Sequence, residues 1–228
     1  MLKKLYLMML IIFLDYLKNL RYNFNERSDN MQVLFATTNQ AKILKYKQRL
    51  EDKGIELLTI NDLDYKLDIE ENGKNALENA YIKASSYYDE FGIPTIGMDD
   101  NLFIEGIKES EQPGVFVRRV NGKELNDDEM IEHYTNLVKK YGNKLIAKWV
   151  YGMVVINNGE SHEFSWSYDD FYLVDTPSEK RNIGYPLDSI SIDINTNKYF
   201  VDLTNEDKQK KKESIDEVIS FILKSIGK

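Results

Sequence analysis

The sequence of 228 residues contains no cysteine and only two histidines, His133 and His162. Without cysteine, the chain can form no disulfide, thiolate nucleophile or cysteine-based zinc site. The two histidines lie far apart in the sequence, and neither belongs to an H-E-x-x-H pattern, so a zinc enzyme is not expected. Any metal would therefore be held by carboxylates, which suits Mg²⁺.

Positive charge is also in short supply, because 30 Lys and Arg face 38 Asp and Glu, for a net charge of −8. Such a surface repels the nucleic-acid backbone, so we expect no nucleic-acid partner. A small anionic substrate needs only a local cluster of cations and N–H groups or a bridging metal, so a nucleotide enzyme stays open. The 42% of hydrophobic residues suffice for one core, and the length suits one large domain.

The first thirty residues differ from the rest of the chain. Lys3 and Lys4 precede an apolar run over 5–14 that is shorter than the roughly 20 residues of a membrane span. The run resembles the start of a signal peptide, but no small-residue cleavage site follows. We interpret 1–30 as an N-terminal extension, a wrongly assigned start or an extra amphipathic helix, ahead of an export signal. The domain then covers 31–228, and we expect a cytoplasmic protein without stable membrane insertion.

The order of apolar patterns predicts an α/β protein. Strands are expected at 32–36, 55–60, 95–98, 145–156 and 163–174, and helices between 39 and 54 and over 75–91, 127–141 and 213–226. The turn residues Asn157-Asn158-Gly159 predict a hairpin. Ala76, Ala80 and Ala84 recur every four residues and predict a flat, close-packing helix face.

The junction between the first strand and the first helix of the domain, 35–42, is a candidate phosphate site. A helix N-terminus offers free N–H groups and a positive dipole end. Thr38 and Asn39 add side-chain donors, and Lys42 lies in the first turn. The junction lacks the glycines of a P-loop. An ordinary capped helix with a solvated lysine is the commoner meaning of this pattern on its own.

Acidic residues mark two further segments that are candidates for holding a metal and the phosphates it binds. Glu70 and Glu71 precede a helix on which Asn79 and Lys83, four apart, share one face. A solvated acidic turn is the commoner outcome for such a sequence.

The second acidic segment is the pair Asp99-Asp100, which we expect at the end of a buried strand, where ligands gather in open α/β sheets. Adjacent carboxylates repel unless a metal or a proton offsets them, so the pair is a candidate for Mg²⁺ binding and for general-base catalysis. Two exposed acids in a turn are an equally good interpretation of the pattern.

In this order, the segments resemble the inosine triphosphate pyrophosphatase family, which includes pyrophosphatases for non-standard purine nucleotides. Six motifs carry the resemblance: FATTNQAK (35–42), EENGKNALENAYIKA (70–84), GMDDNLFIEGI (97–107), QPGVFVRR (112–119), NIGYP (182–186) and NEDK (205–208). The resemblance implies an elongated, two-lobed α/β fold with a mixed sheet and a central cleft. It also implies a homodimer that hydrolyses nucleoside triphosphates to monophosphate and pyrophosphate with Mg²⁺.

The resemblance also implies roles for individual residues. Asp100, with Asp99 beside it, would be the catalytic base. Metal ligands would be Glu70 and Asp100, with Glu71 as the alternative to Glu70. The residues that would bind the nucleotide are Thr38, Asn39, Lys42, Lys83, Tyr185 and Lys208.

The part of the resemblance that concerns the base is altered. The family's Asp-Asp-Ser-Gly-Leu is Asp-Asp-Asn-Leu in this chain, and Phe-Gly-Tyr-Asp-Pro becomes Ile-Gly-Tyr-Pro, with Asp188 out of register. The family's Ser-His-Arg, which reads the 6-keto group, becomes Lys212-Glu213-Ser214. Losing polar readout changes or relaxes specificity. Three hypotheses follow: a pyrophosphatase for purine nucleotides such as ITP, dITP and XTP, the same reaction on another base, or a nucleotide-binding protein with little turnover.

Overall fold

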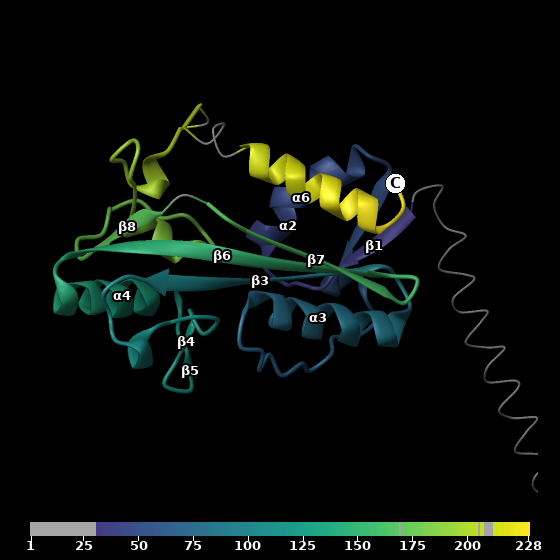
Figure 1. The fold of residues 1–228 in the computed structure, drawn as a ribbon, viewed down its shortest axis with the longest axis horizontal. Coiled ribbons are helices and arrows are strands. Elements are labelled where there is room, and N and C mark those ends of the chain that lie inside the picture. The colour runs from purple at the N-terminus through teal and green to yellow at the C-terminus, as the bar shows by residue number, and fades with distance from the viewer. Residues whose placement is uncertain (1–30, 169, 205, 208–211) are drawn as a thin grey trace, which may run out of the picture.

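The structure, a computed structural model, describes residues 31–168, 170–204, 206–207 and 212–228. It is an elongated mixed α/β molecule whose long axis follows two long strands, as Figure 1 shows. The helices are α2 (Gln40–Glu51), α3 (Ala76–Phe91), α4 (Asp127–Tyr141) and α6 (Lys212–Ser225). The strands are β1 (Met31–Phe35), β2 (Ile55–Thr59), β3 (Thr95–Ile104), β4 (Arg119–Val120), β5 (Lys123–Glu124), β6 (Lys144–Asn157), β7 (Glu160–Ser167), β8 (Phe171–Val174) and β9 (Ser191–Asp193).

One mixed sheet organises the molecule, in the order β2-β1-β3-β6-β8-β9, with β7 also paired to β6. β1 runs parallel to β2 and β3, whereas β3 and β6 are antiparallel over ten residue pairs. Val33, Leu34 and Phe35 are all buried, as expected for a parallel strand covered on both faces. The predicted α/β class with a mixed sheet is confirmed.

The two largest of the apolar clusters mark two lobes of the molecule. In the first lobe, α2 and α6 cover one face of the sheet and share a core with β1, β2 and β7. In the second lobe, α4 shares a core with the C-terminal part of β3 (Leu102 and Ile104), the N-terminal part of β6 (Ala147) and β8. The long pair β3–β6 runs through both lobes, so residues in its middle lie where the two cores meet.

Helix α3 lies unusually close to the opposite face of the sheet. Ala76, Ala80 and Ala84 are buried there, as their spacing predicts. The approach requires glycine on the sheet side, because a Cβ on Gly97 would lie 1.9 Å from the Ala80 carbonyl oxygen. This packing fixes the helix face that carries Asn79 and Lys83 relative to β3.

Local signals set most helix ends and the hairpin as predicted. The Asn39 side chain caps α2, and Gly92, at φ 66°, ends α3. Asn158 and Gly159 both have positive φ, which gives the type I′ turn between β6 and β7.

Two expectations about strands are wrong. The strand expected at 95–98 continues to Ile104, so Asp99 and Asp100 lie inside it and not at its end, because β6 supplies antiparallel partners along its whole length. The single strand expected over 163–174 is two strands, β7 and β8. Both pair with β6, but the register shifts by one residue between Val150↔Ser167 and Ala147↔Phe171, as in a β-bulge. The N-terminal segment 1–30 lies outside the described residues.

Candidate functional site

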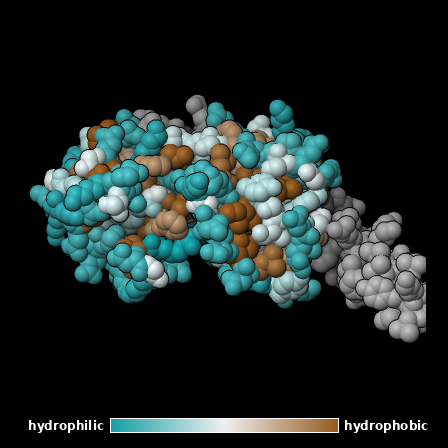
Figure 2. All heavy atoms as spheres, turned by 60° about the horizontal axis from the view of Figure 1, so that its bottom comes forward, coloured by the Kyte–Doolittle hydropathy of each residue, from teal (hydrophilic) through white to brown (hydrophobic). Residues whose placement is uncertain are grey.

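A large pocket lies between the two lobes, with a volume of about 810 Å³. This is the size of a site for a nucleotide-sized ligand. Figure 2, turned so that the α3 side comes forward, shows a largely hydrophilic surface with a notch between the lobes. The wall combines residues from α2, the middle of β3 and β6, the segment 115–119 and the η3 turn (Pro186–Ser189). It therefore joins the predicted phosphate segments to residues of the second lobe.

The start of α2 forms one end of this pocket. Asn39 lines it, and its side-chain oxygen accepts hydrogen bonds from the N–H groups of Ala41 (3.0 Å) and Lys42 (3.3 Å). Thr38 is exposed and is not among the residues that line the pocket. Asn39 thus both caps α2 and lines the pocket. The positive end of the helix dipole faces the pocket.

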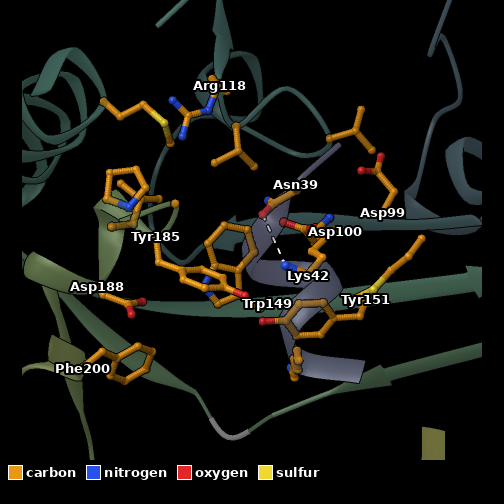
Figure 3. A pocket seen from close by; sticks show the side chains of 18 of the residues that line it. Asn39, Lys42, Asp99, Asp100, Arg118, Trp149, Tyr151, Tyr185, Asp188 and Phe200 are labelled. Carbon is orange, nitrogen blue, oxygen red and sulfur yellow. Dashed lines mark hydrogen bonds and ion pairs between the residues drawn. The ribbon is translucent and has the colours of Figure 1, made fainter. Parts of the chain in front are cut away.

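Lys42 and Asp100 form an ion pair inside the pocket (Figure 3). Burial alone would lower the pKa of Lys42, but the charges of Asp100 and Asp99 outweigh burial and raise the pKa above its ordinary value. Lys42 therefore stays protonated at neutral pH. A cation in the first turn of α2, beside a carboxylate on β3, gives this part of the pocket both signs of charge.

A second ion-pair network lies on the α3 side of β3. The Lys83 Nζ is 3.2 Å from an Asp99 oxygen and 3.0 Å from a Glu71 oxygen. Asn79 donates a hydrogen bond to Asp99 at 2.8 Å. Glu71 lines the pocket, whereas Glu70 is exposed and is not among the lining residues. The structure thus brings Glu71, Lys83, Asn79 and Asp99 together.

The two adjacent aspartates reach the pocket from opposite faces of one strand. Successive side chains of a strand alternate between faces, so Asp99 contacts α3 and Asp100 contacts α2. β1 pairs with β3 only as far as Ile96, and beyond it the structure describes only the single bridge Leu102↔Gly114 on that edge. The pocket opens at this edge, so both carboxylates line it. Figure 3 shows them pointing in different directions.

The oxygen ligands that Mg²⁺ prefers are present in this pocket. Glu71 and Asp99 both lie within 3.2 Å of the same ammonium nitrogen, so two carboxylates already surround one cation. Among the residues that the structure describes, no three His, Asp or Glu side chains gather closely enough to hold a metal by themselves. Mg²⁺ commonly takes only one or two carboxylates from a protein and completes its shell with waters and substrate phosphates.

The wall of the pocket on the β6 side, where Tyr151 is the strand partner of Asp100, is aromatic. Trp149 and Tyr151 from β6 are joined there by Tyr168 and Tyr185. The rings of Trp149 and Tyr151 stack at 6.4 Å, and Tyr151 meets Tyr168 edge-on at 5.4 Å. Burial and then the charge of Asp100 raise the pKa of Tyr151 well above its ordinary value, so its hydroxyl stays protonated. Flat apolar rings with neutral hydroxyls form a surface on which a planar base can stack.

The segment around Tyr185 forms part of the pocket wall. Tyr185 lines the pocket, and burial raises its pKa. Ile183, which stands where the resemblance expects an aromatic residue, is 96% exposed. Asp188 reaches the pocket wall and accepts a hydrogen bond from Asn182 at 2.8 Å. Lys208 lies outside the described residues.

Several pocket residues have no counterpart among the predicted site residues: Lys45, Lys66, Arg118, Arg119, Trp149, Tyr151 and Tyr168. The two-residue spacing of Trp149 and Tyr151 on a strand is a signal that could have found that pair. Tyr168 is brought in by the bulge between β7 and β8, for which the sequence gives no signal.

No helix in the described part of the chain is long and apolar enough to cross a membrane.

Comparisons with known proteins point in one direction. The sequence profile of the Ham1 family matches residues 33–214. A dITP/XTP pyrophosphatase of Aquifex aeolicus is 33% identical over 189 residues, which cover 79% of this chain and 89% of that protein. One from Leptospira interrogans serovar copenhageni is 29% identical over 195 residues, covering 84% and 96%.

Solved structures share the fold. A HAM1 protein from Coxiella burnetii superposes with a TM-score of 0.71 at 21% identity and covers 85% of this chain and 99% of its own. The Ham1 protein of Staphylococcus aureus gives 0.68 at 22% identity, covering 84% and 97%. The elongated α/β fold expected from the sequence is confirmed.

Proposed function

The chain belongs to the Ham1 family, and on this premise we propose that it hydrolyses nucleoside triphosphates to the monophosphate and pyrophosphate. The proposed substrates are non-standard purine nucleotides such as ITP, dITP and XTP, in keeping with the names of its relatives. One observation carries the proposal: a single pocket joins the start of α2 and the Lys42–Asp100 pair to an aromatic wall. A triphosphate and a base need these two ends.

Binding of the triphosphate falls to the polar end of the pocket. Lys42 supplies a protonated ammonium group in the first turn of α2, where the helix dipole adds positive potential. Lys83 supplies a second cation on the α3 side. Asn39 lines the same wall, Thr38 and Lys208 complete the proposed set of nucleotide-binding residues, and Tyr185 lies at the base end.

The proposed metal is Mg²⁺, held by Glu71 and Asp99, with Glu70 and Asp100 as the other candidate ligands. Mg²⁺ bound there would neutralise phosphate charge and acidify water. The ammonium groups of Lys42 and Lys83 now occupy the carboxylates, and arriving phosphates compete for the same lysines. Exchange of partners would leave carboxylate oxygens for the ion and ammonium groups for the phosphates.

The chemical step follows from these charges. A water oxygen attacks the α-phosphorus and forms a new P–O bond, while the bond from the α-phosphorus to the oxygen bridging to the β-phosphate breaks. Pyrophosphate leaves with the electron pair of that bond. Asp100 accepts the proton of the attacking water and later returns it to solvent. Lys42 and Lys83 stabilise the charge that develops on the leaving pyrophosphate.

The test is pyrophosphate release from a panel of nucleoside triphosphates, measured with Mg²⁺ and after chelation. We expect turnover that requires Mg²⁺ and is fastest with ITP, dITP or XTP. Asp100→Asn should keep nucleotide binding and lose about 10²- to 10⁴-fold in kcat, the contribution typical of a general base. Asp89→Asn, an exposed acid on α3 outside the pocket, is the matched control.

Each other outcome has a defined meaning. Fastest turnover of a different base would retain the reaction and replace the substrate. Binding without turnover of any nucleotide would leave a nucleotide-binding protein. Full activity of Asp100→Asn would remove Asp100 from the mechanism. The homodimer implied by the resemblance remains a prediction, and the molar mass in solution checks it.

A further inference from the structure

Among the described lysines that line the pocket, Lys45 alone is surrounded by aromatic rings. Its Nζ lies 5.3 Å from the ring centre of Tyr168, 5.6 Å from that of Tyr46 and 5.7 Å from that of Tyr151. It also donates a hydrogen bond to the Tyr168 hydroxyl at 3.2 Å. Cations are attracted to ring faces at such distances, so the ammonium group is held at the aromatic wall of the pocket.

The charge of Lys45 is not offset in the way that its neighbours' charges are. Lys42 pairs with Asp100, and Lys83 pairs with Asp99 and Glu71. Within the described ranges, no carboxylate lies at ion-pair distance from Lys45, and its one polar partner there is a phenol. An ammonium group has three donors, so donors remain for an oxygen atom of a ligand in the pocket.

Lys45 lies further along α2 than Lys42, the lysine proposed to bind phosphate. It follows Lys42 by three residues on the same face of α2, so it lies about 4.5 Å further from the helix N-terminus along the helix axis. Phosphates are drawn to the N-terminus, whereas Lys45 faces Tyr151 and Tyr168, beside Trp149. Flat apolar walls suit a planar base better than a fully hydrated phosphate.

We propose that Lys45 is a specificity-determining residue that donates a hydrogen bond to the 6-oxygen of a keto purine base. The inference rests on the proposed function, because it presupposes a purine nucleotide in this pocket. An ammonium group donates and cannot accept, so it matches a keto oxygen and opposes the 6-amino group of adenine, which also donates. Lys45 therefore favours ITP and XTP over ATP.

The experiment compares two nucleotides that differ at one atom: ITP, and purine riboside triphosphate, which has no 6-oxygen. For the wild-type chain and Lys45→Met, kcat/KM is measured for both, with ATP as a third substrate, and Kd is measured by calorimetry. We expect Lys45→Met to reduce the preference for ITP over the purine analogue about 10- to 100-fold, the loss of a charge-assisted hydrogen bond. The preference for ITP over ATP should fall as well.

Two further variants act as controls. Lys45→Arg keeps a side chain that only donates, so it should retain most of the preference for ITP. Lys47→Met removes a half-buried lysine of the same helix, which pairs with Glu51 and is not among the residues that line the pocket, and it controls for the change in net charge. Circular dichroism and melting temperature confirm that each variant folds.

The outcomes separate this inference from the proposed function. Equal losses on ITP and the purine analogue would mean that Lys45 acts on the phosphates or the sugar, and would overturn the inference. An unchanged ratio in Lys45→Met would overturn it too. If the wild-type chain turned over no nucleotide, the pyrophosphatase proposal would fall, and the ratio of the two Kd values would still decide the role of Lys45.

Discussion

The close approach of α3 to the sheet predicts that Gly97→Ala is strongly destabilising. A Cβ at this position would lie 1.9 Å from the Ala80 oxygen and 2.9 Å from the Ala84 nitrogen, although real Cβ contacts stay beyond 3.0 Å. The helix would have to retreat by about 1 Å. Overpacking a core costs about 1–3 kcal/mol. Because a helix carbonyl cannot rotate away, we expect the upper end, about 3 kcal/mol, or a melting temperature lower by about 6–12 °C.

The assay is thermal and urea unfolding followed by circular dichroism, with two comparison variants. Gly106→Ala meets no atom within 4 Å but has φ +77°, so it should cost only the about 1–2 kcal/mol of a left-handed residue. Adding Ala80→Gly to Gly97→Ala should not restore stability, because the clash is with the backbone and glycine itself costs about 1 kcal/mol in a helix. A Gly97→Ala chain within 1 kcal/mol of the wild type, a margin of about one overpacked methylene, would refute this reasoning.

Two predictions concern single side chains. Glu71→Gln should lower kcat/KM at limiting Mg²⁺ about tenfold more than Glu70→Gln, since Glu71 is the one of the two that lines the pocket and contacts Lys83; a larger loss from Glu70→Gln would make Glu70 the ligand. Burial lowers the pKa of His133 from its ordinary 6.5, so the folded state binds that proton less readily than the unfolded chain does. The contribution of neutral His133 to the free energy of unfolding is complete above pH 6.5 and is lost as the pH falls through the folded pKa. Replacing the side chain in His133→Gln should therefore make the free energy of unfolding fall less steeply between about pH 7 and 5, and His162→Gln is the control. An unaltered slope in His133→Gln would remove His133 as the cause.

Features encoded by short, contiguous patterns were predictable from the sequence. The cap at Asn39 and the turn Asn158-Gly159 each depend on a few neighbouring residues, and both formed as expected. Helix α4 spans Asp127–Tyr141, the range predicted for it. The alanine face of α3 could also be predicted from the sequence, because its four-residue spacing is a local pattern.

Features that depend on distant partners were not predictable. The length of β3 is set by pairing with β6, whose paired residues lie 43 to 61 positions away in the sequence, so the strand predicted at 95–98 continues to Ile104. The break between β7 and β8 arises from a one-residue change of register against the same partner. Glu70 and Glu71 look equivalent in sequence, and only the packing of their loop on α3 brings Glu71 to the pocket.

The polar and the aromatic parts of the pocket differ in the same way. This explains why the polar part could be predicted from the sequence and the aromatic part could not. The polar part consists of consecutive residues of one strand-to-helix junction and one aspartate pair, so short sequence motifs are enough to predict it. The aromatic part takes single residues from separate elements: Lys45 from α2, Tyr151 from β6, Tyr168 from the bulge and Tyr185 from a loop. Each is unremarkable alone, because aromatic and basic residues occur throughout such a chain. A base site assembled in this way can change its donors and acceptors one residue at a time while the phosphate site stays intact.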